Sequence, residues 1–265
     1  MKGKTISLLQ SGDFIGMVRH LFRKRVVNAL ALPLYAYIIP PLTRALMPAC
    51  RDTQINGLFE VKKTSDITDH LAVLFCEVLK SDPSLVVELG TRKGDSTRAL
   101  LQAASIAGAK MISVDMMDCS QFVDDDSMKN TWRFVQADDV AFAGEFVVWC
   151  RSNGFPETVD VLFVDTSHEY EHTLAEIRAW FPLLSERGKV IFHDTHMKRY
   201  VKRKNGSIVK GWNNERGVIR AIEETLGRAY DETAPFIDRL GGWLIEHLPY
   251  SSGLTIMTRM GDEKS

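Results

Sequence analysis

The feature that most constrains this chain is a regular alternation of short apolar runs with longer segments of helical periodicity. The segments follow one another in this order: helix 67–80, strand 85–89, helix 96–107, strand 110–114, helix 142–153, strand 159–164, helix 169–184 and strand 189–192. Short apolar strands that alternate with helices of about 10 to 15 residues indicate βαβ units and a parallel sheet. The sequence therefore predicts an α/β fold.

The C-terminal part of the chain departs from this alternation. A helix near 215–226 precedes two strand-like segments, 242–246 and 253–258, which indicate an antiparallel hairpin. A further strand ends near 135–138. We therefore expect a Rossmann-like fold, with a seven-stranded, mostly parallel sheet and an antiparallel last strand.

The composition is that of an ordinary globular protein of 265 residues, 45% of them hydrophobic and 25% charged. The formal net charge of -1 creates no positive field that would attract nucleic acid, so we expect no nucleic-acid partner. The four cysteines are scattered, without metal-binding or disulfide-framework spacing. Reduced thiols, and the lack of a signal-peptide pattern at the N-terminus, favour the cytoplasm.

The chain is expected to divide into an N-terminal helical extension, 1–63, and a catalytic domain, 64–260. Within the extension, a basic cluster leads into an apolar stretch at 26–40 that prolines interrupt. A transmembrane helix needs about 20 uninterrupted apolar residues, so we exclude a membrane span. Two alternatives stay open for the extension: helices that pack on the domain or on a second subunit of a homo-oligomer, and peripheral membrane contact through residues 20–49.

The strand at 85–89 leads into a loop that has the glycines of a cofactor site. Gly90 and Gly94 stand four residues apart, just before the next helix. Glycine lets the backbone turn sharply and approach a ligand closely, and the helix N-terminus offers free N–H donors. Ligands of open α/β sheets bind at the carboxyl ends of the strands, which makes this loop the first candidate site. Its candidate cofactor-binding residues are Glu88, Gly90, Thr91, Gly94 and Ser96.

Two cofactors compete for this loop. A nicotinamide-binding fingerprint has three glycines in the pattern G-x-G-x-x-G, whereas only two are present here, at a different spacing. Glu88 would be a poor neighbour for a diphosphate, but it suits the cationic sulfonium and ammonium groups of S-adenosylmethionine. The loop therefore favours S-adenosylmethionine, and the alternative is a nicotinamide-dependent oxidoreductase.

Two further acids follow the next strands. Asp115 ends the second strand, where a carboxylate can accept hydrogen bonds from both hydroxyls of a ribose. Asp138 follows the third strand, where a carboxylate could meet an adenine amino group. Both are candidate cofactor-binding residues, and a solvent-facing loop position is the alternative for Asp138.

The ends of the fourth and fifth strands carry the residues best suited to catalysis. Asp165 and His168 follow the fourth strand, and His193 and Asp194 follow the fifth. Neighbouring strand ends would bring the four side chains together. Carboxylates and imidazoles that converge can hold a divalent cation, which makes a bound hydroxyl more acidic, and a histidine can remove its proton. This chemistry suits methyl transfer to oxygen.

A competing motif overlaps this region, because residues 168–172 fit the H-E-x-x-H pattern of helical zinc sites in metalloproteases. The motif starts where a buried strand gives way to its helix, inside a βαβ series, and no G-x-x-H continuation follows. We therefore reject a zinc protease.

The residues of these sites resemble a known family. The glycine loop at 86–96, Asp115 and the segments 163–177 and 180–194 are similar to class I methyltransferases that depend on S-adenosylmethionine. The nearest resemblance is to the cephalosporin hydroxylase-like or macrocin-O-methyltransferase-like family, whose members often methylate sugar hydroxyls. The likeness covers about residues 64 to 257, and the D-x-x-H-x-Y segment with the later H-D pair is its most specific part.

The resemblance implies roles for individual residues. Glu88, Gly90, Gly94 and Asp115 would contact the cofactor, Asp165 and Asp194 would bind Mg²⁺ or another divalent metal, and His168 would be the general base. Metal-binding relatives often carry two adjacent acids at the end of the fifth strand, whereas His193 stands before Asp194 here. His193 is therefore a candidate third ligand, and a metal-free reaction with a histidine base stays open.

The sequence thus predicts an O-methyltransferase that acts on a hydroxyl of a sugar or another small metabolite. A non-catalytic binding protein that retains the fold is a further alternative. The intact set of Asp165, His168 and Asp194 speaks against it.

Overall fold

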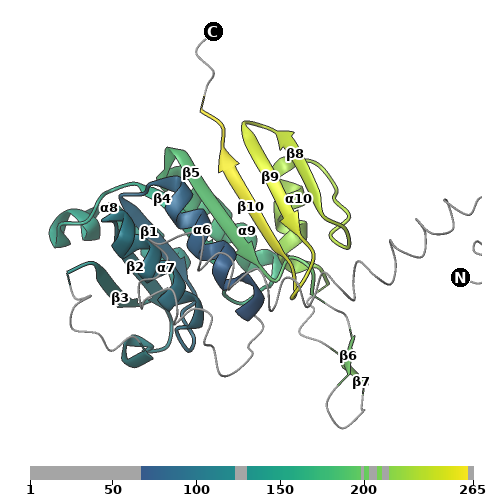
Figure 1. Cartoon of the computed structure of the whole chain (residues 1–265), viewed down its shortest axis with the longest axis horizontal. Coiled ribbons are helices and arrows are strands. Elements are labelled where there is room, and N and C mark those ends of the chain that lie inside the picture. The colour runs from purple at the N-terminus through teal and green to yellow at the C-terminus, as the bar shows by residue number, and fades with distance from the viewer. Residues whose placement is uncertain (1–66, 123–129, 198–199, 203–207, 211–214, 262–265) are drawn as a thin grey trace, which may run out of the picture. The chain divides into compact units, whose positions relative to one another are not determined.

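Five strands of the main sheet are parallel to one another, and most of their apolar side chains are buried. They are β1 (Leu85–Leu89), β2 (Lys110–Asp115), β3 (Trp132–Gln136), β4 (Val159–Val164) and β5 (Leu184–His193). The structure is a computed structural model that describes residues 67–122, 130–197, 200–202, 208–210 and 215–261 (Figure 1). Every residue of β1 is buried, as expected for a central strand of a parallel sheet.

The order of the strands places a crevice at the ends of β1 and β4. The sheet runs β3-β2-β1-β4-β5-β10-β9-β8, so the chain moves outward from β1 to β3 and then returns past β1 to β4. Ligands of doubly wound sheets bind where the strand order reverses in this way. Right-handed connections in the two directions also place helices on both faces of the sheet.

Five helices cover the sheet in the described part of the chain. They are α6 (Leu71–Ser81), α7 (Asp95–Ala107), α8 (Asp139–Asn153), α9 (Tyr170–Trp180) and α10 (Gly217–Leu226). Helix α6 packs on α7, while α9 packs on both α8 and α10. In Figure 1, α6 lies in front of the sheet and α9 and α10 lie behind it.

The last three strands of the sheet are antiparallel to their neighbours. They are β8 (Phe236–Leu240), β9 (Trp243–Leu248) and β10 (Leu254–Arg259). The predicted hairpin of β9 and β10 is confirmed, but the main sheet has eight strands among the described residues, one more than predicted. The additional strand, β8, joins β9 through Gly241 and Gly242, whose φ angles of 57° and 78° suit a tight hairpin turn.

Several element boundaries differ from the prediction. Helix α6 begins at Leu71 and follows a 3₁₀ turn at Thr68–His70. Helix α9 ends at Trp180, because Pro182 lies in the next 3₁₀ turn, Phe181–Leu183, and β5 therefore begins five residues before the predicted start. Other short elements are a 3₁₀ turn at Ser120–Phe122 and the two-stranded sheet of β6 (Tyr200–Lys202) and β7 (Ile208–Lys210).

A buried ion pair joins α6 to β5. Lys189 Nζ lies 2.5 Å from Glu77 Oε2, and both residues are less than 10% exposed. Burial raises the pKa of the Glu77 carboxyl, but its hydrogen bonds with Lys189 and Lys80 outweigh burial and hold the pKa below its usual value. The pair therefore links a covering helix to the centre of the sheet.

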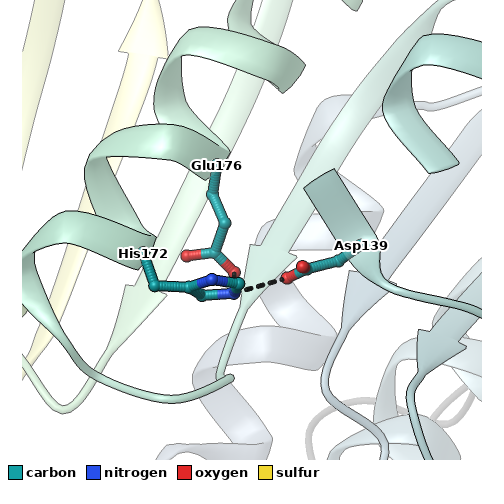
Figure 2. A group of neighbouring side chains, drawn as sticks. All are labelled: Asp139, His172 and Glu176. Atoms are coloured by element: carbon teal, nitrogen blue, oxygen red, sulfur yellow. Dashed lines mark hydrogen bonds and ion pairs between the residues drawn. The ribbon is translucent and has the colours of Figure 1, made fainter. Parts of the chain in front are cut away.

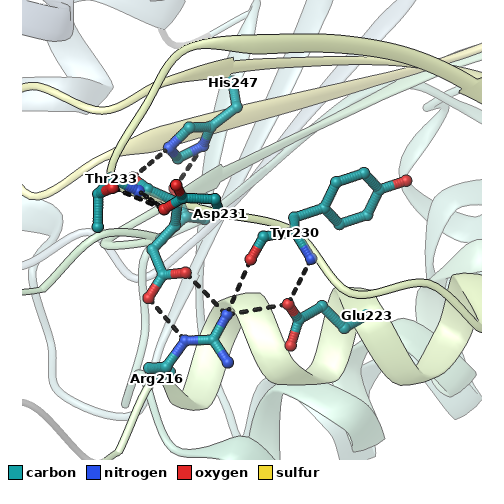
Figure 3. Close-up of polar contacts among 8 residues, drawn as sticks. Arg216, Glu223, Tyr230, Asp231, Thr233 and His247 are labelled. Carbon is teal, nitrogen blue, oxygen red and sulfur yellow. Dashed lines mark hydrogen bonds and ion pairs between the residues drawn. The ribbon is translucent and has the colours of Figure 1, made fainter.

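A second ionic network fixes the segment after α10 (Figure 3). Arg216 donates from Nε to Glu232 Oε1 at 2.6 Å and from Nη2 to Glu232 Oε2 at 2.7 Å, a bidentate geometry. The same guanidinium reaches Glu223 Oε1 at 2.9 Å and the carbonyl of Tyr230 at 3.2 Å. His247 Nε2 lies 2.9 Å from the carbonyl oxygen of Glu232, which ties this segment to β9.

Several predictions fall outside the described residues. They concern the extension at 1–63, its boundary with the catalytic domain and the membrane contact at 20–49, and they stay predictions. In the part of the chain that the structure describes, no helix is both long and apolar enough to cross a membrane.

Candidate active site

The glycine loop between β1 and α7 presses against the end of β4. Gly90 has a φ of 88°, and a Cβ atom there would lie 2.1 Å from the carbonyl oxygen of Asp165. The Gly90 amide donates to the carbonyl of Val114 at 2.9 Å. Gly94, at a φ of 75°, immediately precedes α7. Gly90 is thus required both by its backbone angle and by its close approach to β4.

Glu88 lies beneath this loop and is fully buried. Its Oε1 accepts a hydrogen bond from Ser96 at 2.6 Å, and its Oε2 accepts from Thr97 and Ser113, each at 2.7 Å. Burial raises the pKa of this carboxyl to about 7, although the three hydroxyls oppose the shift. Both oxygens are engaged, so the structure gives Glu88 and Ser96 a role in holding the loop rather than a place in the cavity wall.

Asp115 connects the glycine loop to the end of β2. Its Oδ2 accepts from the amides of Thr91 at 2.9 Å and Arg92 at 3.1 Å, while Oδ1 accepts from Met117 at 2.9 Å. The carboxylate therefore orders the loop as well as facing the space beside it.

A cavity of about 430 Å³ opens at the switch point of the sheet. Its walls include Gly90, Asp115, Ala137, Asp138, Asp165 and Thr166. The predicted residues Glu88, Thr91, Gly94 and Ser96 do not line this cavity. Asp138 is exposed and caps α8 by accepting a hydrogen bond from the Ala141 amide at 2.8 Å. The volume is within the usual range for pockets that hold small cofactors, about 300 to 1,000 Å³.

The four predicted catalytic residues meet next to the cavity. His168 Nε2 lies 2.9 Å from Asp194 Oδ2 and 3.2 Å from Asp165 Oδ1. His193 Nδ1 lies 3.3 Å from Asp165 Oδ1 and 3.4 Å from Asp194 Oδ2. His168 and Asp194 have φ angles of 60° and 57°, and such strained backbone often occurs at functional sites.

The charges in this group hold one another in place. Burial alone would lower the pKa of both histidines, but Asp165 and Asp194 raise it to about 9 for His168 and about 10 for His193. The same contacts hold the pKa of both carboxyls below the usual range, against the effect of their burial. The two carboxyls and the two imidazoles therefore stabilise each other's charged forms.

The donor set also fits a divalent cation. Asp165, His168 and Asp194 each offer a ligand atom, and these atoms lie within 4.8 Å of one another. His193, the third ligand in the sequence prediction, lies outside this set. His193 is 1% exposed and contacts the same carboxylates, while its Nε2 has no hydrogen-bond partner.

Known proteins share both the sequence pattern and the fold. Residues 87–195 match the model of a family described as a methyltransferase domain. This chain contains a class I S-adenosylmethionine-dependent methyltransferase domain. An uncharacterized protein of Acanthamoeba polyphaga mimivirus is 21% identical over 137 residues, which are 50% of this chain and 61% of the relative.

Solved methyltransferases have a similar fold. A putative caffeoyl-CoA O-methyltransferase from Staphylococcus aureus has a TM-score of 0.54 and 14% identity over 85% of this chain and 99% of that one. An O-methyltransferase from Bacillus cereus in complex with SAH has a TM-score of 0.53 and 13% identity over 83% and 96%. TomG from Streptomyces achromogenes, in complex with SAM, has a TM-score of 0.53 and 11% identity over 80% and 91%.

In this methyltransferase, the H-E-x-x-H pattern does not form one site. Helix α9 begins at Tyr170, so His168 precedes the helix and His172 lies in its first turn. The side chain of His168 joins Asp165 and Asp194, whereas that of His172 joins Asp139 and Glu176. The two histidines of the pattern therefore belong to separate groups.

A second group of this methyltransferase was missed by the sequence prediction. Asp139, His172 and Glu176 also bring their ligand atoms within 4.8 Å of one another (Figure 2). The available signal was the four-residue spacing of His172 and Glu176, which places them on one face of a helix. Asp139 gave no signal, because α8 begins three residues before the predicted helix.

Proposed function

We propose that this methyltransferase transfers a methyl group from S-adenosylmethionine to a hydroxyl oxygen of a sugar or another small metabolite. The observation that carries the proposal is the meeting of His168 with Asp165 and Asp194 at the strand ends that border the cavity. A base within reach of two potential cation ligands is suited to the deprotonation of an alcohol. The O-methyltransferases with a similar fold support the same reaction class.

The cofactor would lie in the cavity between the glycine loop and the end of β4. The Gly90 backbone allows a ligand to approach β1 closely, and Asp115 offers a carboxylate to a ribose. Asp138 also lines the cavity, two residues after the end of β3. The acceptor hydroxyl would then approach the methyl carbon from the side of His168, opposite the leaving sulfur.

The proton of the acceptor must leave as the oxygen–carbon bond forms and the carbon–sulfur bond breaks. Asp165 and Asp194 would hold a divalent cation, which when bound makes a nearby hydroxyl more acidic. His168 takes the proton, and for this it must first be neutral. Its pKa of about 9 comes from the two carboxylates, so neutralisation of their charge returns His168 toward the basic form needed at neutral pH.

The test compares His168→Gln with His196→Gln, a matched histidine control outside the group. Formation of S-adenosylhomocysteine is measured with a panel of sugars, glycosides and phenols, with and without Mg²⁺. We expect His168→Gln to lower the turnover rate about 100-fold or more, with unchanged binding of S-adenosylhomocysteine, and His196→Gln to stay near wild type. Equal turnover of His168→Gln and wild type would contradict the assigned base.

The identity of the acceptor is part of the same test. Methyl transfer to a nitrogen or carbon acceptor alone, with no hydroxyl compound methylated, would overturn the proposal of an O-methyltransferase. The homo-oligomer and the cytoplasmic location predicted from the sequence stay predictions.

A further inference from the structure

Asp139, His172 and Glu176 form a compact polar group that the proposed reaction does not use. His172 Nε2 lies 3.2 Å from Asp139 Oδ2 and 3.6 Å from Glu176 Oε1 (Figure 2). Asp139 is the first residue of α8, while His172 and Glu176 stand one turn apart on α9. The group shares no residue with that of Asp165, His168 and Asp194.

Surrounding contacts hold Asp139 and Glu176 in position. The carbonyl of Asp139 accepts a hydrogen bond from the indole of the fully buried Trp180 at 3.2 Å, and its Oδ1 accepts from the Val140 amide at 2.8 Å. Thr166 donates to Glu176 Oε1 at 2.6 Å. Each side chain therefore projects from a helix whose backbone is fixed, which is the arrangement that a metal site requires.

One carboxyl oxygen of Glu176 has no hydrogen-bond partner within the protein. The residue is 1% exposed, yet its Oε2 has no hydrogen-bond partner. Asp139, the second carboxyl of the group, is also buried. A buried carboxyl oxygen without a partner is costly unless a bound group satisfies it, and His172 and Asp139 both lie beside this carboxyl.

We propose that Asp139, His172 and Glu176 bind a first-row transition-metal dication such as Zn²⁺. Metal bonds of about 2.0–2.1 Å at tetrahedral angles place ligand atoms about 3.3–3.5 Å apart. The two measured separations, 3.2 and 3.6 Å, are close to this spacing. One imidazole nitrogen with two carboxylate oxygens suits Zn²⁺ or Co²⁺ better than Mg²⁺, which prefers oxygen ligands and water.

The site is open to the cavity on one side. Asp139 and His172 line the cavity, while Glu176 closes the site from within. An ion can therefore enter from the cavity, and one coordination position is left to water or to a ligand there. Three protein ligands with one open position is a common pattern for zinc that is not purely structural.

The experiment isolates this site from the other group. The full chain with Asp194→Asn, which removes a ligand of the other group, is freed of metal with a chelator and titrated with Co²⁺ and Zn²⁺. His172→Gln and, as the matched control, His196→Gln are each added to that background. Binding is measured by the visible absorption of bound Co²⁺ and by calorimetry, and stability is measured by thermal unfolding.

We expect the Asp194→Asn protein and its His196→Gln derivative to bind one Co²⁺ with visible absorption bands. Zn²⁺ at about 100 times its dissociation constant should raise their Tm by about 5 °C or more. His172→Gln should weaken the affinity at least about 100-fold and abolish the shift in Tm. Glu176→Gln provides a second ligand variant should His172→Gln unfold.

Two results would overturn the proposal. One is the absence of Co²⁺ binding to the Asp194→Asn protein. The other is binding that neither His172→Gln nor Glu176→Gln weakens relative to His196→Gln. Metal binding tests the proposed site, whereas turnover tests the proposed methyl transfer. A loss of turnover without a change in metal binding would therefore count against the methyl transfer only.

Discussion

At the scale of single residues, Glu88 shows how a buried acid can serve a binding loop without lining the cavity. Three hydroxyls, from Ser96, Thr97 and Ser113, surround its carboxyl group, so its polar atoms are satisfied away from water. The sequence indicated an acid aimed at a cationic cofactor. In the structure the acid joins β1, β2 and α7 beneath the glycine loop.

This burial predicts a pH-dependent stability. The pKa of Glu88 rises from 4.5 to about 7 on folding, so the folded chain keeps a proton that the unfolded chain releases. The contribution of the protonated Glu88 carboxyl to the free energy of unfolding is fully present below pH 4.5, and it is lost as the pH rises through 7. Glu88→Gln cannot ionise, so its stability relative to wild type should increase between pH 5 and pH 8 by up to about 3 kcal/mol. Urea unfolding at the two pH values measures the difference, and parallel changes in both proteins would contradict it.

The candidate active site could be predicted in part from single residues. Asp165, His168, His193 and Asp194 were identifiable because each follows an apolar strand, and parallel strands end at the same edge of a sheet. His172 and Glu176 were not, because polar residues four apart on a helix are also the pattern of an ordinary solvated face. Only the tertiary packing of α8 on α9 shows that Glu176 is buried.

At the scale of elements, apolar strands and helices with clear periodicity were predictable, and the sheet edge was not. Strands β1 and β4 have the predicted bounds, since each is apolar at every position but one. Strand β8 was missed because none of its residues is fully buried, so hydrophobic and polar side chains do not alternate clearly from Phe236 to Leu240. Its signal was the Gly241–Gly242 turn, which fixes a hairpin whatever the hydrophobicity of the strand.

The ion pair between α6 and β5 gives a prediction at this scale. Lys189→Met removes the buried cation and leaves Glu77 with Lys80, whose side chain is 68% exposed. We expect the free energy of unfolding to fall by about 3 kcal/mol, because an uncompensated buried carboxylate is costly. Glu77→Gln added to Lys189→Met should recover a large part of the loss. Denaturant titration measures both, and a loss below about 1 kcal/mol for Lys189→Met would show that the pair is not a strong link.

At the scale of the whole molecule, the strands that precede β4 in the chain and those that begin with β4 meet where β1 pairs with β4, beside Gly90. Strands β1, β2 and β3 carry the glycine loop, Asp115 and Asp138, while β4 and β5 carry the group to which we assign catalysis. The cavity lies where β1 and β4 pair, and Gly90 lies close to the backbone of Asp165 at that point. This arrangement follows from the order of the strands in the sheet. The sequence pattern predicts that strands and helices alternate, but it does not predict that order.

Gly90→Ala should accordingly damage the fold and the cofactor site together. A Cβ atom at 2.1 Å from the Asp165 carbonyl requires backbone movement at the ends of β1 and β4. Gly108→Ala is the matched control, since it has a φ of 71° but no atom within 4 Å of the new Cβ. The control should lose about 1 kcal/mol of stability from its backbone angle alone, and should bind S-adenosylhomocysteine as the wild type does.

Gly90→Ala should lose at least about 2 kcal/mol and bind S-adenosylhomocysteine at least about 10-fold more weakly, because the wall that Gly90 shares with Asp165 must shift. Thermal unfolding and calorimetric titration measure the two effects. Equal losses of stability in the two alanine variants, with unchanged affinity, would mean that the approach of β1 to β4 does not shape the site. A larger loss of stability and of affinity in Gly90→Ala than in Gly108→Ala would show that the close approach of β1 to β4 is needed for cofactor binding.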